Sequence, residues 1–236
     1  MTDSAKTRAA SAKAKALAIG AAHVARLHNR AMAALLLLLV AAVFVLPAAV
    51  PSAEVRNELT EAVLVLILIS GLVAVLEHRR LAVALAVLSA IVVVLHSMEW
   101  LLPHELLPTL RTVMTMLAFA MLAVAVGINV FAPRRAIADR VFGAIVLYLL
   151  LGLVWGVIYA TIEMHAPGSF AGTLRLDERL SDWVYYSFVT LTTVGYGDIT
   201  PVSMAARAIA MLEALVGQLY PAIIIARLVS LQGNSR

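Results

Sequence analysis

The sequence contains no cysteine and few charged residues. The absence of cysteine from all 236 residues excludes a disulfide framework, a thiolate metal site and a cysteine nucleophile. Asp, Glu, Lys and Arg together make up 14% of the chain, whereas 63% of the residues are hydrophobic and the mean hydropathy is +0.97. An average soluble domain has about 25% charged residues. The sequence therefore predicts an integral membrane protein, with little polar sequence left for a separate soluble domain.

The charge that is present is mostly positive. The formal net charge is +4 and the isoelectric point is about 9.7. A basic balance can indicate nucleic-acid binding, but in a membrane protein Lys and Arg gather on the cytoplasmic side. Their distribution among the loops decides between these interpretations, and it requires the membrane spans to be placed first.

Long apolar runs follow one another along most of the chain. A bilayer core about 30 Å thick needs about 20 apolar residues in a helix, and lipid offers no partner to open backbone groups. Six runs are close to this length, although the second and third are short unless their ends extend. They are residues 31–50, 62–76, 81–95, 112–131, 141–162 and 205–231. Residues 77–80, Glu-His-Arg-Arg, predict a tight turn between the second and third runs, because charged groups are costly in hydrocarbon.

Positive charge assigns a side of the membrane to each loop. Six spans put both ends of the chain on one side, and 13 of the 18 Lys and Arg residues fall on that side. The richer side is predicted to be cytoplasmic. We therefore expect a multi-pass protein of the cell membrane with both termini in the cytoplasm, and no nucleic-acid partner. The basic residues 1–30 form either a helix that lies on anionic lipid or a disordered tail.

The sequence between the fifth and sixth runs differs from the rest. Residues 163–182 are polar and contain Pro167, Gly168 and Gly172, which indicates a loop. Residues 183–192 are apolar and aromatic but too short to cross the membrane, so they predict a re-entrant half-helix. The partially negative C-terminal end of such a helix would point towards the membrane centre, where it favours a cation.

The half-helix is followed by Thr-Thr-Val-Gly-Tyr-Gly-Asp at residues 192–198. A pore can remove water from an ion only if it supplies replacement oxygens, and backbone carbonyls can do so if successive residues point them inward. Gly195 and Gly197 favour such a conformation, because a residue without Cβ adopts dihedral angles that are closed to others. The side chains of Val194 and Tyr196 can then pack outward.

This segment, with the half-helix before it and the span after it, resembles the potassium channel family. The resemblance is strong over residues 141–231 and only architectural over the first four spans. It implies a selectivity filter that consists of Thr193, Val194, Gly195, Tyr196 and Gly197. The carbonyl oxygens of the first four residues would bind K⁺, and the Thr193 hydroxyl would add an oxygen at the inner end. Because each chain supplies one loop, the resemblance implies a homotetramer, with K⁺ as the transported ion and no organic cofactor.

The resemblance also implies which residues hold the filter in place. Asp198 would hold the outer end, against an aromatic residue of the half-helix such as Tyr185 or Trp183, and Thr192 is a further supporting residue. Some family members carry a glutamate on the half-helix behind the filter. The corresponding residue here is Val189, so that form of support is absent.

The last span is predicted to be the inner helix of the pore. Gly217 and Pro221 could form a hinge because proline interrupts helical hydrogen bonding, or Gly217 could simply permit close helix packing. The two interpretations have equal weight. Gln218 is expected to face a water-filled cavity. Glu213 lies on a different face, where we favour a structural role, with a bond to the half-helix or to a neighbouring subunit, over direct attraction of ions.

The predicted fold is an all-α membrane protein with six transmembrane helices and a re-entrant helix and filter between helices 5 and 6. Its regions are a basic cytoplasmic segment (1–30), a four-helix membrane domain (31–131), a cytoplasmic linker (132–140), a pore domain (141–231) and a short cytoplasmic tail (232–236). Residues 112–131, the fourth span, contain no arginine, so steep voltage gating is not expected. With so short a tail, no nucleotide-binding or calcium-binding cytoplasmic domain is expected.

The predicted function is passive conduction of K⁺ by a pore-forming subunit, without enzyme chemistry. Two alternatives stay open, namely a less selective cation channel and a non-conducting regulatory subunit. A haem-based electron carrier is disfavoured, because it needs paired intramembrane histidines and only His96 is a candidate.

Overall fold

The computed structural model describes residues 30–50, 53–76, 78–98, 106–131, 137–172 and 180–233. Nearly all of them are helical. The first helix begins at Arg30 and continues through the π-helix η1 (Ala41–Val45) and α2 (Leu46–Ala49). The other elements are α3 (Ala53–Val75), α4 (Arg79–Met98), α5 (Leu106–Phe131), α6 (Ile137–His165), β1 (Phe170–Gly172), α7 (Leu180–Leu191), β2 (Ile199–Pro201) and α8 (Met204–Gly233). Apart from Arg30, the predicted basic segment lies outside the described residues.

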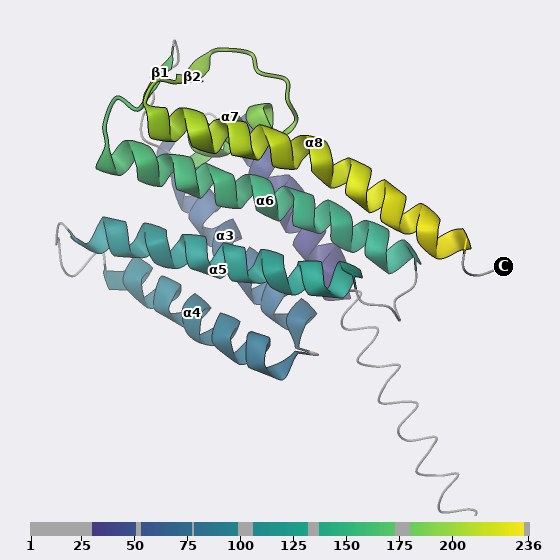
Figure 1. Ribbon diagram of the computed structural model, residues 1–236. Helices are drawn as coiled ribbons and strands as arrows, with labels where there is room; N and C mark the ends of the chain where they lie inside the picture. The colour runs from purple at the N-terminus through teal and green to yellow at the C-terminus, as the bar shows by residue number, and fades with distance from the viewer. Residues whose placement is uncertain are drawn as a thin grey trace, which may run out of the picture.

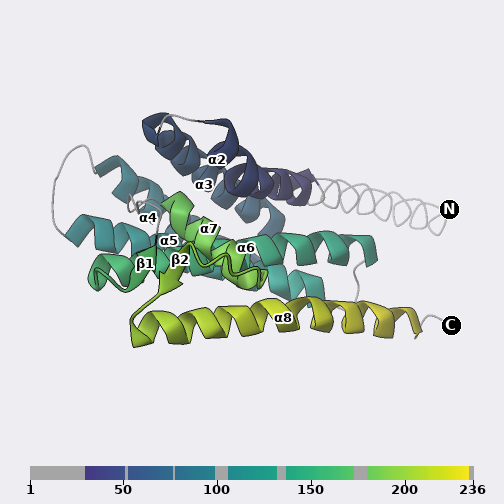
Figure 2. The same ribbon diagram turned by 90° about the horizontal axis from the view of Figure 1, so that it is seen from above.

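The long helices lie side by side in a bundle. Helices α4, α5, α6 and α8 follow one another across the molecule, and α3 and the first helix cross behind them at an angle (Figure 1). Helix α8 forms one side of the bundle (Figure 2). The short helix α7 packs against α6 and α8 and also contacts η1. It therefore lies between the last two long helices and the start of the chain.

Each of the six predicted runs is helical, but they do not all qualify as membrane spans. Among the described residues, five helices are long and apolar enough to cross a membrane. They are Arg30–Ala49, Arg79–Met98, Leu107–Phe131, Asp139–His165 and Met204–Ser230. The second predicted run lies in α3, whose apolar part Ala62–Val75 is shorter. A sixth crossing by α3 stays a prediction.

The ends of the helices account for the two short runs. Helix α4 includes Arg79 and Arg80 and reaches 20 residues, and α3 extends towards the N-terminus over residues 53–61, which include four charged residues. The predicted tight turn between them lies at Leu76 and His78, with Glu77 outside the described residues. The charged residues therefore lie at the ends of the two apolar runs and do not interrupt one long helix.

Two features of the fold have no counterpart in the predicted pattern. The first helix widens to a π-helix over Ala41–Val45, just before Pro47. Proline has no N–H for a helical hydrogen bond, and a π-bulge is one way for a helix to accommodate it. The second feature is an antiparallel pair of strands, in which Phe170 lies opposite Pro201 and Gly172 lies opposite Ile199. Three-residue strands are too short to produce a periodic apolar signal.

The buried side chains form two clusters. The larger one joins the first helix to α3, α4, α5 and α6, with Leu35, Phe119 and Leu150 fully buried. The smaller one is aromatic and lies where β1, α7 and α6 meet. In it the Phe170 ring lies 5.0 Å from Trp183, within the range for favourable aromatic pairs. This second cluster ties the strand pair to α7.

Candidate functional site

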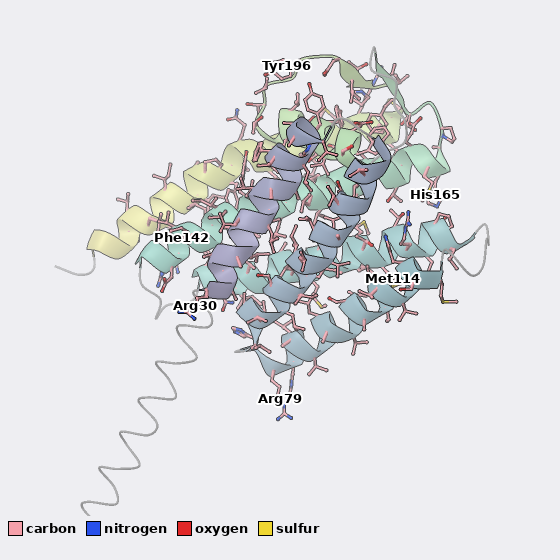
Figure 3. The ribbon with its side chains drawn as sticks, turned by 180° about the vertical axis from the view of Figure 1, so that it is seen from behind. Arg30, Arg79, Met114, Phe142, His165 and Tyr196 are labelled. Atoms are coloured by element: carbon pink, nitrogen blue, oxygen red, sulfur yellow. The ribbon has the colours of Figure 1, made fainter. Side chains whose placement is uncertain are left out.

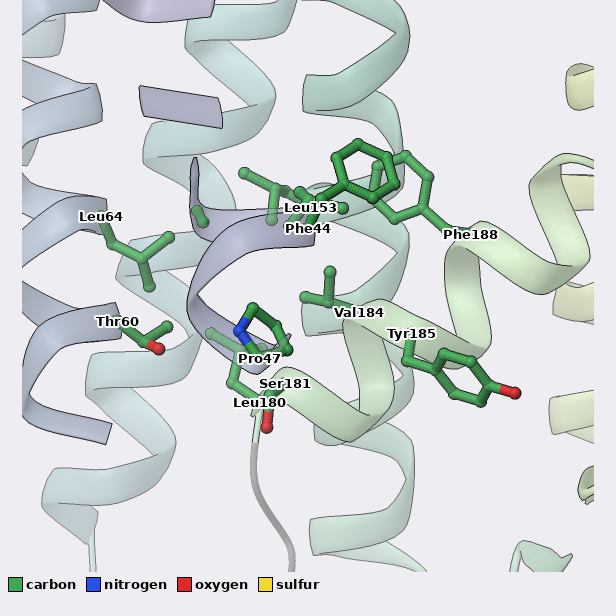
Figure 4. A pocket seen from close by; sticks show the side chains of 12 residues that line it. Phe44, Pro47, Thr60, Leu64, Leu153, Leu180, Ser181, Val184, Tyr185 and Phe188 are labelled. Atoms are coloured by element: carbon green, nitrogen blue, oxygen red, sulfur yellow. The ribbon is translucent and has the colours of Figure 1, made fainter. Parts of the chain in front are cut away.

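Helix α7 lies close against α6, on glycines of α6. A Cβ atom placed on Gly156 would lie 2.9 Å from the Cα of Val184, and one on Gly152 would lie 2.4 Å from the Phe188 ring. Small residues allow this approach in a membrane bundle. Val184 and Phe188 also border a cavity of about 150 Å³ that the first helix and α3 line on the other side (Figure 4). The predicted half-helix, residues 183–192, thus lies within α7 apart from its last residue, and α7 packs against α6 and α8.

The chain that leaves α7 is anchored to the last turn of that helix. The carbonyl of Val189 accepts hydrogen bonds from the N–H groups of Val194 (3.0 Å) and Gly195 (3.2 Å). The N–H of Thr192 donates to the carbonyl of Phe188 at 3.0 Å, and the Thr192 hydroxyl donates to the same carbonyl at 2.6 Å. The C-terminal carbonyls of α7 therefore fix the start of the predicted filter, residues 193–197.

The backbone of the predicted filter alternates in handedness. Thr193, Gly195 and Gly197 have φ angles of +61°, +59° and +78°, and the two residues between them have negative φ. Alternating right- and left-handed residues align successive peptide groups, whereas an ordinary strand points them to alternate sides. A Cβ atom on Gly195 or Gly197 would meet nothing within 4 Å. Glycine is therefore required at these positions for its dihedral angles and not for lack of space.

The C-terminal end of the predicted filter, which is predicted to be its outer end, is bonded to α7. The Tyr185 hydroxyl donates to Asp198 Oδ2 at 2.5 Å, and Asp198 Oδ1 accepts from the N–H of Ile199 at 3.0 Å. The hydrogen bond to Asp198 raises the pKa of Tyr185 to about 12, so the hydroxyl keeps its proton at neutral pH. Trp183, the other predicted partner, is buried against Phe170 instead. The structure brings Asp198 together with Tyr185.

The N-terminal end of the predicted filter, which is predicted to be its inner end, contacts α8. Gln218 Nε2 donates to the Thr193 hydroxyl over a long 3.4 Å. A Cβ atom placed on Gly217 would lie 1.8 Å from the carbonyl oxygen of Leu191. Helix α8 runs without interruption through Gly217 and Pro221, although Pro221 cannot supply a helical hydrogen bond to the Gly217 carbonyl. The structure therefore contains the close packing at Gly217, and a bend there stays a prediction.

Behind α7 lies a buried polar cluster (Tyr159, Ser187 and Glu213) whose three side chains have no exposed surface. The Tyr159 hydroxyl donates to Glu213 Oε2. The Ser187 hydroxyl lies 2.5 Å from Glu213 Oε1 and 2.8 Å from the carbonyl oxygen of Gly152. Glu213 thus contacts the half-helix, and no part of its side chain reaches solvent. Sequence reasoning singled out Glu213 as a polar residue in an apolar span, but gave no signal for its two partners.

Comparison with known proteins covers the part of the chain that holds this site. A family model described as "Ion channel" matches residues 145–232. Protein LctB of Bacillus caldotenax is 36% identical over 107 residues, which cover 43% of this chain and 79% of that protein. Two pore potassium channel c of Oryza sativa subsp. japonica is 34% identical over 97 residues, or 41% of this chain and 20% of that protein. This chain belongs to the potassium channel family.

As a member of the potassium channel family, the chain is a membrane protein of ion transport rather than an enzyme. The matched region of this channel subunit contains α7, the predicted filter, the buried polar cluster and nearly all of α8. A second LctB protein, from Geobacillus stearothermophilus, is 37% identical over 108 residues, with 43% of this chain and 78% of that protein covered. No solved structure matches the chain. The first helix, α3, α4 and α5 lie outside the family match.

Proposed function

We propose that the chain is the pore-forming subunit of a K⁺-selective homotetrameric channel that conducts K⁺ passively. The observation that carries this proposal is the alternating backbone of residues 193–197, with its glycines at positive φ. In a ring of four such segments, the carbonyls of Thr193, Val194, Gly195 and Tyr196 would replace the water around K⁺. The dipole of α7, with its C-terminal end at the filter, adds a partial negative charge there.

The exposed surface of one chain supports assembly with other copies. In the most apolar stretch of α8 only 11% of residues are buried, against 56% in α6. Val194 and Tyr196 are 53% and 71% exposed, although outward packing of these side chains is what would hold the filter. Helix α8 lies on one side of the bundle, where further copies can reach it (Figure 2). Four copies around one axis would cover these surfaces and enclose the pore.

The proposed topology has six crossings and cytoplasmic ends. Arg30, Arg79 and Phe142 lie towards one end of the bundle, and Met114 and His165 lie towards the other (Figure 3). The end with the arginines fits the cytoplasmic side. This arrangement requires α3 to cross although its apolar part is short. The 23 residues of α3 extend about 34 Å at 1.5 Å per residue, so α3 can cross only if residues 53–61, with their four charged residues, lie in the headgroup region.

The proposed channel is not steeply voltage-gated. Helix α5 occupies the position of a fourth span and contains a single arginine, Arg111, at its outer end. A voltage sensor needs several charges along one helix to gain enough energy from the field. We therefore propose that the first four spans, residues 31–131, form a scaffold around the pore domain, residues 141–231.

Flux through purified protein in liposomes tests the proposal. We expect K⁺ flux that Ba²⁺ blocks and that greatly exceeds Na⁺ flux. Gly195→Ala should abolish the flux, because alanine disfavours a φ of +59°. The matched control is Gly127→Ala, whose Cβ would meet one side chain at an ordinary 3.5 Å. Equal Na⁺ and K⁺ flux would identify a less selective cation channel, and an assembled but silent protein would identify a regulatory subunit.

A further inference from the structure

A carboxyl group sealed among three helices is not explained by ion conduction alone. Burial of a carboxyl group is costly unless hydrogen-bond donors satisfy its oxygens. Glu213 meets this condition, because one oxygen contacts the Tyr159 hydroxyl of α6 and the other contacts the Ser187 hydroxyl of α7. With no exposed surface, the group cannot act on ions in a water-filled cavity. The hydrogen bonds of Glu213 indicate which elements it holds together.

Ser187 is the member of the cluster that connects Glu213 to the predicted filter. It lies two residues before Val189, whose carbonyl accepts hydrogen bonds from Val194 and Gly195. A displacement of α7 at Ser187 therefore moves the acceptor that fixes the first filter residues. Ser187 also contacts the Gly152 carbonyl at 2.8 Å, so it ties α7 to α6 as well as to α8.

The same stretch of α8 meets the filter region at two further points. Gly217 follows Glu213 by four residues and so lies on the same face of the helix. It packs against the carbonyl of Leu191, the last residue of α7, and Gln218 reaches the Thr193 hydroxyl. Helix α8 therefore contacts α7 and the filter over little more than one turn, and Glu213 makes the most buried of these contacts.

We propose that Glu213 is a positioning residue for the filter, which couples α8 to the filter through Ser187 and the Val189 carbonyl. This inference rests on the proposed conduction function. Its consequence is that ion selectivity, and not only stability, depends on the Glu213 side chain. A movement of α8 near Glu213 is therefore expected to change the geometry of the filter.

The test compares four variants in liposomes, with the K⁺/Na⁺ permeability ratio as the main readout. Glu213→Ala should lower the ratio by about tenfold, because the Tyr159 hydroxyl loses its acceptor and the Ser187 hydroxyl loses its link to α8 and keeps only the Gly152 carbonyl. Glu213→Gln should stay within about threefold of the wild type, since an amide oxygen and N–H₂ group can satisfy both hydroxyls. Ser187→Ala and Tyr159→Phe should lower the ratio by intermediate amounts, with the larger effect from Ser187→Ala.

Two controls separate positioning from general stability. Ser70→Ala removes a hydroxyl that donates to the Ala31 carbonyl at 2.9 Å, which links α3 to the first helix and makes no contact with the filter. Ser89→Ala removes a buried hydroxyl that has no hydrogen-bond partner among the described residues. Both should keep the wild-type permeability ratio. A second readout is the shift in the unfolding temperature of the tetramer when K⁺ replaces Na⁺, because an ion bound to the folded filter stabilises it.

The outcomes are distinct. A folded Glu213→Ala tetramer with the wild-type ratio and K⁺ shift would overturn the positioning role. If Glu213→Ala does not assemble, a normal ratio in both Ser187→Ala and Tyr159→Phe would overturn it equally. A Gln variant as impaired as the Ala variant, with Ser187→Ala unaffected, would point to a direct effect of the charge and also overturn it. Absence of K⁺ flux and of a K⁺ shift in the wild type would reject the proposed function, and this inference with it.

Discussion

The hydrogen bond between Tyr185 and Asp198 joins α7 to the outer end of the predicted filter. Successive residues of a helix are turned by about 100°, so Trp183 and Tyr185 point in nearly opposite directions. Only one of the two can face Asp198, and the sequence does not reveal which, because that depends on how α7 rotates against its neighbours. The aromatic cluster around Phe170 holds Trp183 and thereby turns Tyr185 towards Asp198.

Replacement of Tyr185 by Phe removes this hydroxyl and leaves the ring in place. We expect a loss of about 1 kcal/mol, which is less than is typical of a bond to a charged group, because Tyr185 is 39% exposed and water can partly replace the donor. The filter should lose its conducting form faster at low external K⁺, which the decay of K⁺ flux measures. Asp198→Asn keeps an acceptor oxygen and should decay at an intermediate rate. Identical decay in Tyr185→Phe and the wild type would contradict a supporting role for this bond.

Gly217 is a second position where a single residue determines how closely two elements pack, in this case α8 and α7. Gly217→Ala places a methyl group against the Leu191 carbonyl, a backbone atom that cannot turn aside. We expect α8 to move away from α7, at the 1–3 kcal/mol or so that overpacking costs. The unfolding temperature of the tetramer should fall, whereas that of Gly127→Ala should not. Unchanged stability with altered opening would instead favour the hinge interpretation.

At the scale of elements, the sequence predicts the helices well and their contacts poorly. Length and hydrophobicity identify each of the six helical runs, since lipid permits little besides helix. The strand pair β1–β2 and the π-helix before Pro47 depend on the tertiary setting and leave no periodic pattern. The partners of Glu213 are unpredictable for the same reason. A polar residue in an apolar span is visible, but Tyr159 and Ser187 approach it only through the packing of α6 and α7 on α8.

The cavity between α7 and the first helix allows a test of how these helices pack. It lies between the first helix, α3, α6 and α7, with the Phe44 and Phe188 rings 6.0 Å apart at one end (Figure 4). Ala42→Leu would fill part of the 150 Å³ with apolar atoms. We expect a gain of about 1 kcal/mol, which is typical of cavity filling, and a higher unfolding temperature of the tetramer.

Ala48→Leu is the matched control for this cavity, because Ala48 lies on the same helix and is exposed. It should leave the unfolding temperature nearly unchanged. Equal shifts in Ala42→Leu and Ala48→Leu would mean that added hydrophobicity, and not the filled space, stabilises the protein. A lower unfolding temperature in Ala42→Leu alone would mean that other groups already occupy the cavity in the tetramer.

At the scale of the molecule, one chain leaves uncovered the surfaces that the proposed pore would use. Helix α6 is enclosed by its neighbours, whereas α8 and the filter side chains are exposed. The larger core joins the first helix to α3–α6, and only a few side chains of α8 reach it. The family match covers most of α6, α7, the predicted filter and α8, and it leaves out the first helix and α3–α5. The helices outside the match thus pack against α6 and α7, and the surface of α8 stays exposed for contact with other copies of the chain.

The absence of cysteine makes the membrane topology directly testable. Single cysteines can be introduced without background labelling at Ala49, Leu76 and Ala166, which are exposed residues at helix ends or turns. If α3 crosses the membrane, an impermeant thiol reagent applied to intact cells should label Ala49→Cys and Ala166→Cys. Leu76→Cys should be labelled only after permeabilisation, because it belongs to the same side as Arg79 and Arg80. Labelling of Leu76→Cys in intact cells would mean that α3 does not cross. The five helices that meet the length and hydrophobicity criteria would then be the only spans among the described residues, and the first and last of them would begin on the same side of the membrane, whereas the proposed six spans make them begin on opposite sides.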